Sequence, residues 1–210
     1  MKKRAFDIFM WVATLGLTSG IFFLPDKIPL HWNGSWQIDR YGSRYEFLII
    51  TLLPIVLYYG FVLAMKIDPK RRNFQSRIAT YELIRKGISV FLILVCCFFY
   101  YMTLNPHANG SLIMCVLTGC LFIAAGNYMP KLPQNFSIGI RTPWAISNER
   151  VWRKTQKFGG YSFVLSGIVI VIWGLFNLPN MAWAMVAIML TMTFIDFVYS
   201  YIVYKKIESE

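Results

Sequence analysis

Long apolar stretches alternate with short polar segments along the 210 residues of the chain. Each stretch holds 18 to 24 residues, the length that a helix needs to cross the roughly 30 Å of hydrocarbon in a bilayer. The six stretches are Ala5–Leu24, Phe47–Met65, Gly87–Leu104, Ser111–Met129, Tyr161–Leu178 and Met181–Tyr204. Because a spanning helix satisfies its own backbone hydrogen bonds, the pattern predicts an all-α integral membrane protein with a six-helix transmembrane bundle. Glycines and polar residues flank the fourth and fifth stretches, so a five-span bundle is the alternative.

Composition agrees with a membrane protein and excludes two other classes. Hydrophobic residues make up 57% of the chain and charged residues 15%, whereas soluble domains carry about 25% charged residues. The chain is too apolar to be disordered, and four cysteines are too few for a secreted disulfide scaffold. All four cysteines lie in the predicted spans and their spacing matches no zinc pattern, so we predict neither a metal nor a cofactor.

The net charge of +11 comes from basic residues that are confined to one side of the predicted bundle. Of the 21 lysines and arginines, 18 lie in residues 1–4, 66–86, 130–160 and the tail, Lys205 and Lys206. Basic loops stay in the cytoplasm, so both termini are predicted to be cytoplasmic and residues 25–46 to be extracellular. Topology and contact with membrane lipids therefore explain the charge, and we predict no direct binding to nucleic acid.

The predicted extracellular loop has the pattern of a compact hairpin. Its Asn33–Gly34 pair is a strong turn signal and lies between Trp32 and Trp36. One interpretation is a contact surface for an extracellular molecule, and the other is a cap that closes the bundle. The candidate ligand-binding residues are His31, Trp32, Asn33 and Asp39. His31 with Asp26 and Asp39 is a weak donor set, so we predict no metal here.

The first predicted cytoplasmic segment is residues 66–86. After a turn at Asp68–Pro69, apolar residues recur at helical spacing, at Phe74, Ile78 and Tyr81. This spacing predicts an amphipathic helix that lies on the membrane surface, where its basic residues attract anionic lipid. A docking face for a cytoplasmic partner is the alternative.

The second predicted cytoplasmic segment is residues 130–160. Its three prolines and Gly139 exclude a continuous helix and predict ordered, irregular backbone beside the membrane. Ser147 has the pattern of an N-cap for a short basic helix over residues 148–157. The Gly159–Gly160 pair that follows is the expected hinge into the fifth span.

Irregular backbone beside a membrane must find polar partners within the protein. We expect Asn127, Arg141 and Trp144 to form a structural knot that supplies them, because an arginine offers five donors. Asp196, roughly 22 Å along the last span, is the expected acidic partner of Arg141, and we favour a structural role for it over a catalytic or proton-carrying one. The candidate motif residues are Asn127, Pro130, Arg141, Pro143, Trp144, Trp152 and Asp196.

The sequence carries no catalytic signature. It contains neither Gly-x-Ser-x-Gly nor His-Glu-x-x-His, and it has no Walker loop or dinucleotide fingerprint. We therefore predict that the protein is not an enzyme. An intramembrane enzyme and a small membrane transporter are the alternative functions.

Two groups of residues resemble the SdpI family of bacterial membrane proteins. The run Ile28–Asn33 resembles the domain of unknown function at the N-terminus of that family. The runs Gly126–Lys131, Gly139–Trp144 and Val151–Thr155 resemble the family signature, and the resemblance extends over nearly the whole chain. Gln156 stands where members of the family often have histidine, so a titrating switch at that position would be absent here.

The resemblance implies a polytopic protein of the bacterial cytoplasmic membrane that confers immunity to a secreted antimicrobial peptide. In the family's namesake system such a protein also relays the presence of the toxin by holding a transcriptional repressor at the membrane. The partners that it implies are the peptide toxin at the extracellular loop and a cytoplasmic repressor at the inner segments. We expect an N-terminal two-span unit, residues 1–65, and a four-span unit, residues 66–210.

Overall fold

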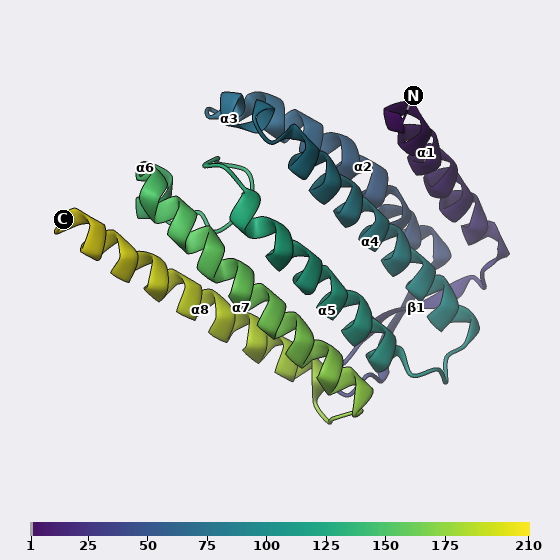
Figure 1. The fold of residues 1–210 in the computed structure, drawn as a ribbon. Helices are drawn as coiled ribbons and strands as arrows, with labels where there is room; N and C mark the ends of the chain where they lie inside the picture. Colours follow the sequence, from purple (N-terminus) through teal and green to yellow (C-terminus); the bar gives the residue numbers. More distant parts are fainter. Residues whose placement is uncertain (1) are drawn as a thin grey trace.

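The computed structural model describes the backbone of residues 2–210 and the side chains of residues 4–210 (Figure 1). The side chains of Lys2 and Lys3, which the charge count includes, lie outside this description. Six helices are long and apolar enough to cross a membrane, as the sequence predicted. They are α1 (Lys2–Gly20), α2 (Phe47–Ile67), α4 (Ile78–Leu104), α5 (Gly110–Tyr128), α7 (Glu149–Leu175) and α8 (Met181–Glu208).

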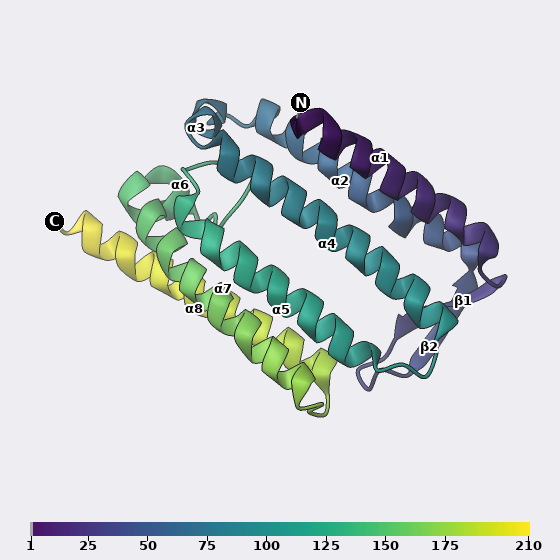
Figure 2. The same ribbon diagram turned by 45° about the vertical axis from the view of Figure 1, so that its right-hand side comes forward.

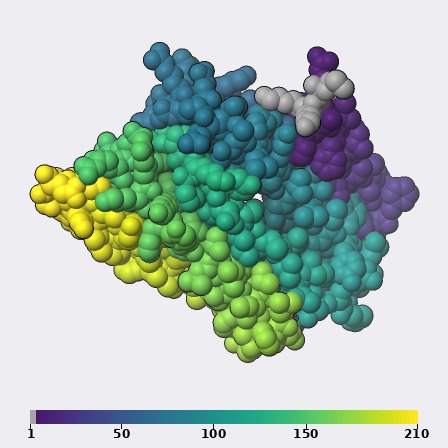
Figure 3. All heavy atoms as spheres, viewed as in Figure 1, coloured from purple at the N-terminus to yellow at the C-terminus, as the bar shows by residue number. Residues whose placement is uncertain are grey.

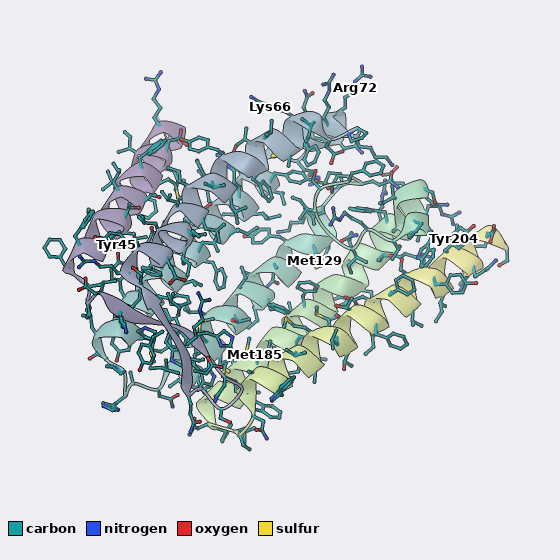
Figure 4. All side chains as sticks on the ribbon, turned by 180° about the vertical axis from the view of Figure 1, so that it is seen from behind. Tyr45, Lys66, Arg72, Met129, Met185 and Tyr204 are labelled. Carbon is teal, nitrogen blue, oxygen red and sulfur yellow. The ribbon has the colours of Figure 1, made fainter. Side chains whose placement is uncertain are left out.

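The six helices alternate in direction, so the connections gather at two ends of the bundle (Figures 1 and 4). At the end that we call the hairpin end are η1 (Ile21–Phe23), β1 (Lys27–Trp32), β2 (Ile38–Ser43) and η2 (Arg44–Glu46). At the other end, which we call the terminus end because both chain ends lie there, are α3 (Arg71–Gln75), η3 (Met129–Lys131) and α6 (Pro143–Ser147). Figure 4 shows Lys66, Arg72 and Tyr204 at the terminus end, with Tyr45 and Met185 at the hairpin end.

The long helices form two groups of three (Figure 2). Helices α1, α2 and α4 pack together, and α5 packs closely on α7, which packs in turn on α8. Because α4 joins the first two helices, the packing divides the chain after its third span. The division into residues 1–65 and 66–210 that we expected from the sequence stays a prediction.

Glycines allow α5 and α7 to approach each other closely. A Cβ atom added at Gly126 would lie 2.5 Å from the carbonyl oxygen of Gly160, and one added at Gly119 would lie 2.6 Å from that of Gly167. On α7 the series Gly160, Gly167, Gly174 repeats every seven residues, which keeps one narrow face against α5. Small residues at a helix interface are how membrane helices gain close van der Waals packing, where lipid offers no hydrophobic driving force.

A buried arginine joins the helices of the first group. Arg85 of α4 donates hydrogen bonds to the Tyr58 hydroxyl of α2 at 3.0 Å and to the Glu82 carboxylate at 2.7 Å. The Tyr58 hydroxyl donates in turn to the Asp7 carboxylate of α1 at 2.6 Å. The guanidinium carbon also lies 4.0 Å from the centroid of the Tyr58 ring. A buried charge is costly unless it is paired, so this network fixes how the three helices meet.

The hairpin that the sequence predicted is present, and it bridges the two groups of helices. Its strands are antiparallel, with Lys27 opposite Ser43. The Trp32 ring packs edge-on against Phe99 of α4, and the Trp36 indole N–H donates to the Met181 sulfur of α8 at 2.9 Å. The hairpin therefore closes one end of the bundle.

Three expectations about the terminus end are wrong. Residues 78–86 do not form a separate helix on the membrane surface, because α4 runs without a break from Ile78 to Leu104. The apolar side chains of Phe74 and Tyr81 are buried instead of facing lipid. Helix α7 likewise passes through Gly159–Gly160 without a hinge, since these glycines serve close helix packing. Its N-cap is Asn148 and not Ser147.

Candidate functional site

The irregular segment, residues 132–142, takes its hydrogen bonds from buried side chains of the surrounding elements. These side chains come from the α2–α3 turn, from the segment itself and from α7 (Figure 1). We call the set the polar lattice; its members are Asp68, Gln134, Asn135, Trp152 and Gln156. All five have at most a tenth of their surface exposed.

Asp68 connects the first helix group to the irregular segment. One carboxylate oxygen accepts from the backbone N–H of Phe136 at 2.9 Å and from the Ser137 hydroxyl at 2.6 Å. The other oxygen accepts from the backbone N–H of Lys70 at 2.8 Å, in the turn that follows Asp68. A carboxylate that accepts several hydrogen bonds in this way is well compensated for its burial.

Asn135 and Gln134 organise the segment from within. The Asn135 side-chain oxygen accepts from the backbone N–H groups of Ser137 and Ile138 at 2.8 and 2.7 Å. Its amide nitrogen donates to the Tyr81 hydroxyl of α4 at 3.1 Å. The Gln134 amide nitrogen donates to the backbone oxygen of Ala145 at 2.9 Å, which ties the segment to α6. These are the partners that an irregular backbone requires when it is removed from water.

Helix α7 supplies the last two members of the polar lattice. The Gln156 side-chain oxygen accepts from the backbone N–H of Ile140 at 3.1 Å, and its amide nitrogen donates to the backbone oxygen of the same residue at 2.8 Å. Gly139 has φ +100°, a backbone conformation that favours glycine. A Cβ atom at this position would also lie 2.6 Å from the Gln156 side-chain oxygen, which is a second reason for glycine here. The Trp152 indole N–H donates to the backbone oxygen of Leu132 at 2.8 Å.

A buried serine joins α8 to the same region. The Ser200 hydroxyl lies 2.7 Å from the Thr142 hydroxyl, and it accepts from the Trp144 indole N–H at 2.7 Å and from the Thr155 hydroxyl at 3.0 Å. The Trp144 ring also stacks against Tyr204 of α8. Trp144 therefore has its partners in the last helix, which the sequence did not predict.

The expected knot of Asn127, Arg141 and Trp144 does not form, and Asp196 is not the acidic partner of Arg141. Asn127 is exposed, and its amide donates to the carbonyl of Ile123 in its own helix at 2.8 Å. Arg141 is exposed and donates to the Phe136 carbonyl at 2.7 Å. Asp196 is buried between α7 and α8, where it accepts from the Ser162 hydroxyl at 3.2 Å. Within the described residues, no ion pair joins Arg141 to Asp196.

The two candidate prolines shape the ends of the segment. Pro130 lies in η3, and its ring is against α7 where Gly160 leaves room for it. Pro143 is the first residue of α6, where its missing N–H costs nothing, and the Thr142 hydroxyl before it caps the helix by accepting from the Ala145 N–H at 3.3 Å.

The candidate ligand-binding residues of the hairpin divide into exposed and structural ones. The His31 ring nitrogen and the Asp39 carboxylate are 2.6 Å apart, and both side chains are exposed. Asn33 holds the turn, because its side-chain oxygen accepts from the backbone N–H groups of Ser35 and Gln37 at 2.9 and 3.0 Å. Trp32 packs against α4, so its ring contributes to the packing of the bundle.

A polar hollow at the hairpin end was not predicted. It has a volume of about 430 Å³ and lies where the hairpin turn meets the loops before α5 and α8. Its lining includes Trp36, Asn109, Asn177 and Asn180. Three of these, Trp36, Asn177 and Asn180, have positive φ, which is unusual for residues other than glycine. Backbone in sparsely populated conformations often collects where a protein binds a ligand.

No group of three or more histidine, cysteine or acidic side chains that could hold a metal ion occurs within the described residues. That the protein works without a metal or cofactor stays a prediction.

Comparisons with known proteins match two regions of the chain, one that contains the hairpin and one that contains most of the polar lattice. Residues 131–200 match the SdpI/YfhL protein family, and residues 8–57 match a domain of unknown function, DUF1648. About a third of the chain is thus similar to the SdpI/YfhL protein family. The chain is 28% identical over 210 residues to the Immunity protein SdpI of Bacillus subtilis (strain 168). The aligned region covers 99% of this chain and 98% of the relative. No solved structure matches the chain.

The SdpI/YfhL match covers most of the polar lattice. Gln134, Asn135, Trp152 and Gln156 lie within residues 131–200, as does Ser200, whereas Asp68 lies outside both matched regions. Trp152 was among the residues predicted from the sequence, but the hydrogen bonding was expected from Arg141. The missed signal was the presence of short amides inside a segment with no helix of its own, since Asn and Gln can both donate and accept.

We expect the replacement Gln156→Leu to loosen the irregular segment. The leucine keeps a similar volume but leaves the Ile140 N–H and carbonyl unpaired, which costs about 1–3 kcal/mol for each buried group. In detergent, the variant should unfold at a lower temperature, and trypsin should cleave after Arg141 faster than in the wild type. Gln75→Leu is the control, because Gln75 is exposed on α3. Unchanged cleavage after Arg141 in the Gln156 variant would show that this pairing does not hold the segment.

Proposed function

We propose that this protein is a membrane immunity protein that protects a bacterial cell from a secreted peptide toxin. The observation that carries the proposal is the similarity to the Immunity protein SdpI over nearly the full length of both chains. The aligned region includes the hairpin as well as the polar lattice.

The proposed orientation places the hairpin end outside the cell and both termini in the cytoplasm. It is supported by the distribution of charge, since 18 of the 21 lysines and arginines belong to segments of the terminus end. With this orientation a secreted peptide reaches the hairpin without crossing the membrane. The polar lattice then lies at the cytoplasmic rim of the bilayer.

We propose that the toxin contacts the hairpin surface and the polar hollow beside it. The exposed His31–Asp39 pair offers charge, and the asparagine amides of the hollow offer both donors and acceptors for peptide groups. Trp32 and Asn33 act by holding the hairpin in place, because one packs on α4 and the other forms the turn. This assignment keeps all four candidate residues at the site and gives them different roles.

The terminus end is the surface on which a cytoplasmic repressor would dock. Arg71, Arg72 and Lys154 are exposed there, and Phe136 of the irregular segment has 41% of its surface exposed. Figure 4 shows Arg72 pointing away from the helices. Such a relay requires the proposed orientation, so the same test applies to both.

We expect expression of this protein to let a toxin-sensitive strain survive concentrations of the peptide that kill the parent strain. Binding without catalysis predicts that the peptide is recovered intact by mass spectrometry, which distinguishes immunity from an intramembrane enzyme. Cells that express the double variant His31→Ala, Asp39→Ala should tolerate about tenfold less toxin, which is equivalent to a loss of ~1.4 kcal/mol of binding free energy.

The matched control for that variant is Glu149→Ala, Arg153→Ala, which removes another exposed ion pair, at the terminus end. Surface ion pairs contribute little stability, so both double variants should be expressed at the wild-type level. Failure of the wild type to protect any strain, or cleavage of the peptide, would refute the immunity proposal. Full protection by the His31, Asp39 variant would refute only the proposed contact.

We expect a membrane-impermeant maleimide to label Ser35→Cys in intact cells. The residue is exposed in the hairpin turn, and the exposed native cysteines, Cys97 and Cys120, are first changed to serine. Lys154→Cys, at the terminus end, should react only after the membrane is permeabilised. The opposite labelling pattern would invert the orientation and exclude a cytoplasmic relay from the terminus end.

A further inference from the structure

An apolar groove lies between the two groups of helices. Its volume is about 560 Å³, and its walls come from α4 and α5, with Phe163 of α7 behind them. Figure 3 shows a gap at the seam between the atoms of α4 and α5. The groove is formed because the two groups are joined at both ends, by the hairpin and by the polar lattice, whereas α5 packs far more closely on α7 than on α4.

The length of the groove fits one leaflet of a bilayer. Its α4 wall runs from Leu83 to Leu94, and its other wall, formed by α5 and the first residue of η3, runs from Leu117 to Met129. At about 1.5 Å per residue these walls are roughly 17 and 18 Å long, slightly more than half of the ~30 Å hydrocarbon core. The groove therefore begins at the terminus end and stops near the middle of the membrane.

The terminus end of the groove is closed by the irregular segment. Ile138, Gly139 and Ile140 line it, and Gln156 fixes their backbone through its two hydrogen bonds to Ile140. The shape of the groove thus depends on the polar lattice.

Two exposed cations flank this closed end. The Lys131 ammonium lies 4.8 Å from the centroid of the Tyr128 ring, which lines the groove. Arg141 directly follows Ile140, and the hydrogen bond to Phe136 occupies only one of its five donors. Within the described residues, neither Lys131 nor Arg141 forms an ion pair with a carboxylate. An apolar groove that ends beside two free cations is complementary to an anionic amphiphile.

We propose that the groove binds one acyl chain of an anionic phospholipid from the leaflet at the terminus end, with its phosphate held by Lys131 and Arg141. The bilayer supplies such chains at high concentration, and filling an apolar void restores the dispersion contacts that its walls would otherwise lack. The proposal does not depend on immunity to a toxin.

Two glycines provide a matched test of this site. A Cβ atom added at Gly87 or at Gly60 meets no heavy atom within 4 Å, so both positions accept a large side chain. Gly87 lines the groove, whereas Gly60 lies on α2 outside it. The protein would be purified with added phosphatidylglycerol or phosphatidylcholine, and retained lipid would be counted by native mass spectrometry.

We expect the wild type and Gly60→Phe to retain one phosphatidylglycerol per chain, and Gly87→Phe to retain at least tenfold less. The preference for phosphatidylglycerol should fall about fivefold in Lys131→Gln and in Arg141→Gln, and stay unchanged in Lys154→Gln. Equal retention of lipid by Gly87→Phe and the wild type, or equal retention of the two lipids by the wild type, would overturn the proposal.

A second measurement covers the case in which Gly87→Phe fails to fold. Cys120 lines the groove, whereas Cys97 is exposed outside it. In the delipidated wild type, phosphatidylglycerol should slow the reaction of Cys120 with an apolar maleimide and leave Cys97 unaffected. Equal protection of the two cysteines would mean that the lipid covers the helices without entering the groove.

Discussion

The backbone of residues 132–142 must be hydrogen-bonded without forming a helix, and the terminus end is built around this requirement. Side chains from the α2–α3 turn, the segment itself and α7 meet most of it, through Asp68, Asn135 and Gln156. Each of these side chains is buried, so each would be costly if its partner were lost. The segment and the polar lattice therefore depend on each other. The side chains of the lattice hydrogen-bond the backbone of the segment, and that backbone supplies the partners that these buried side chains need.

The same constraint links the fold to the two proposed binding surfaces. The polar lattice joins the helix groups at the terminus end, as Trp32 and Trp36 join them at the hairpin end. Between these two closures the groups need not pack tightly, and the apolar groove occupies the space. A ligand at the hairpin end and a lipid in the groove would thus both act on the contacts that join the two groups of helices. The glycines of α5 and α7 keep these two helices in close contact.

The sequence was sufficient for the spans and the hairpin because both depend on local pattern. Apolar length predicted the six helices, and Asn33–Gly34 between tryptophans predicted the turn.

The sequence was insufficient for the site because the partners there are far apart in the chain. Arg141 had the most donors and Asp196 was the most conspicuous buried acid, yet one is exposed and the other binds Ser162. Asp68 was interpreted as a turn residue, and only its distance from Phe136 reveals its role. The surface helix expected within residues 66–86 was wrong for a related reason: basic residues near a membrane are compatible with a spanning helix that extends beyond the bilayer.

Amide hydrogen exchange across the terminus end tests most directly whether the polar lattice governs this architecture. The backbone N–H groups of Phe136, Ile138 and Ile140 lie outside any helix but are held by Asp68, Asn135 and Gln156. In nanodiscs, the account predicts that these three amides exchange as slowly as those in the first turns of α7. Exchange as fast as that of the loop at residues 105–109 would contradict it.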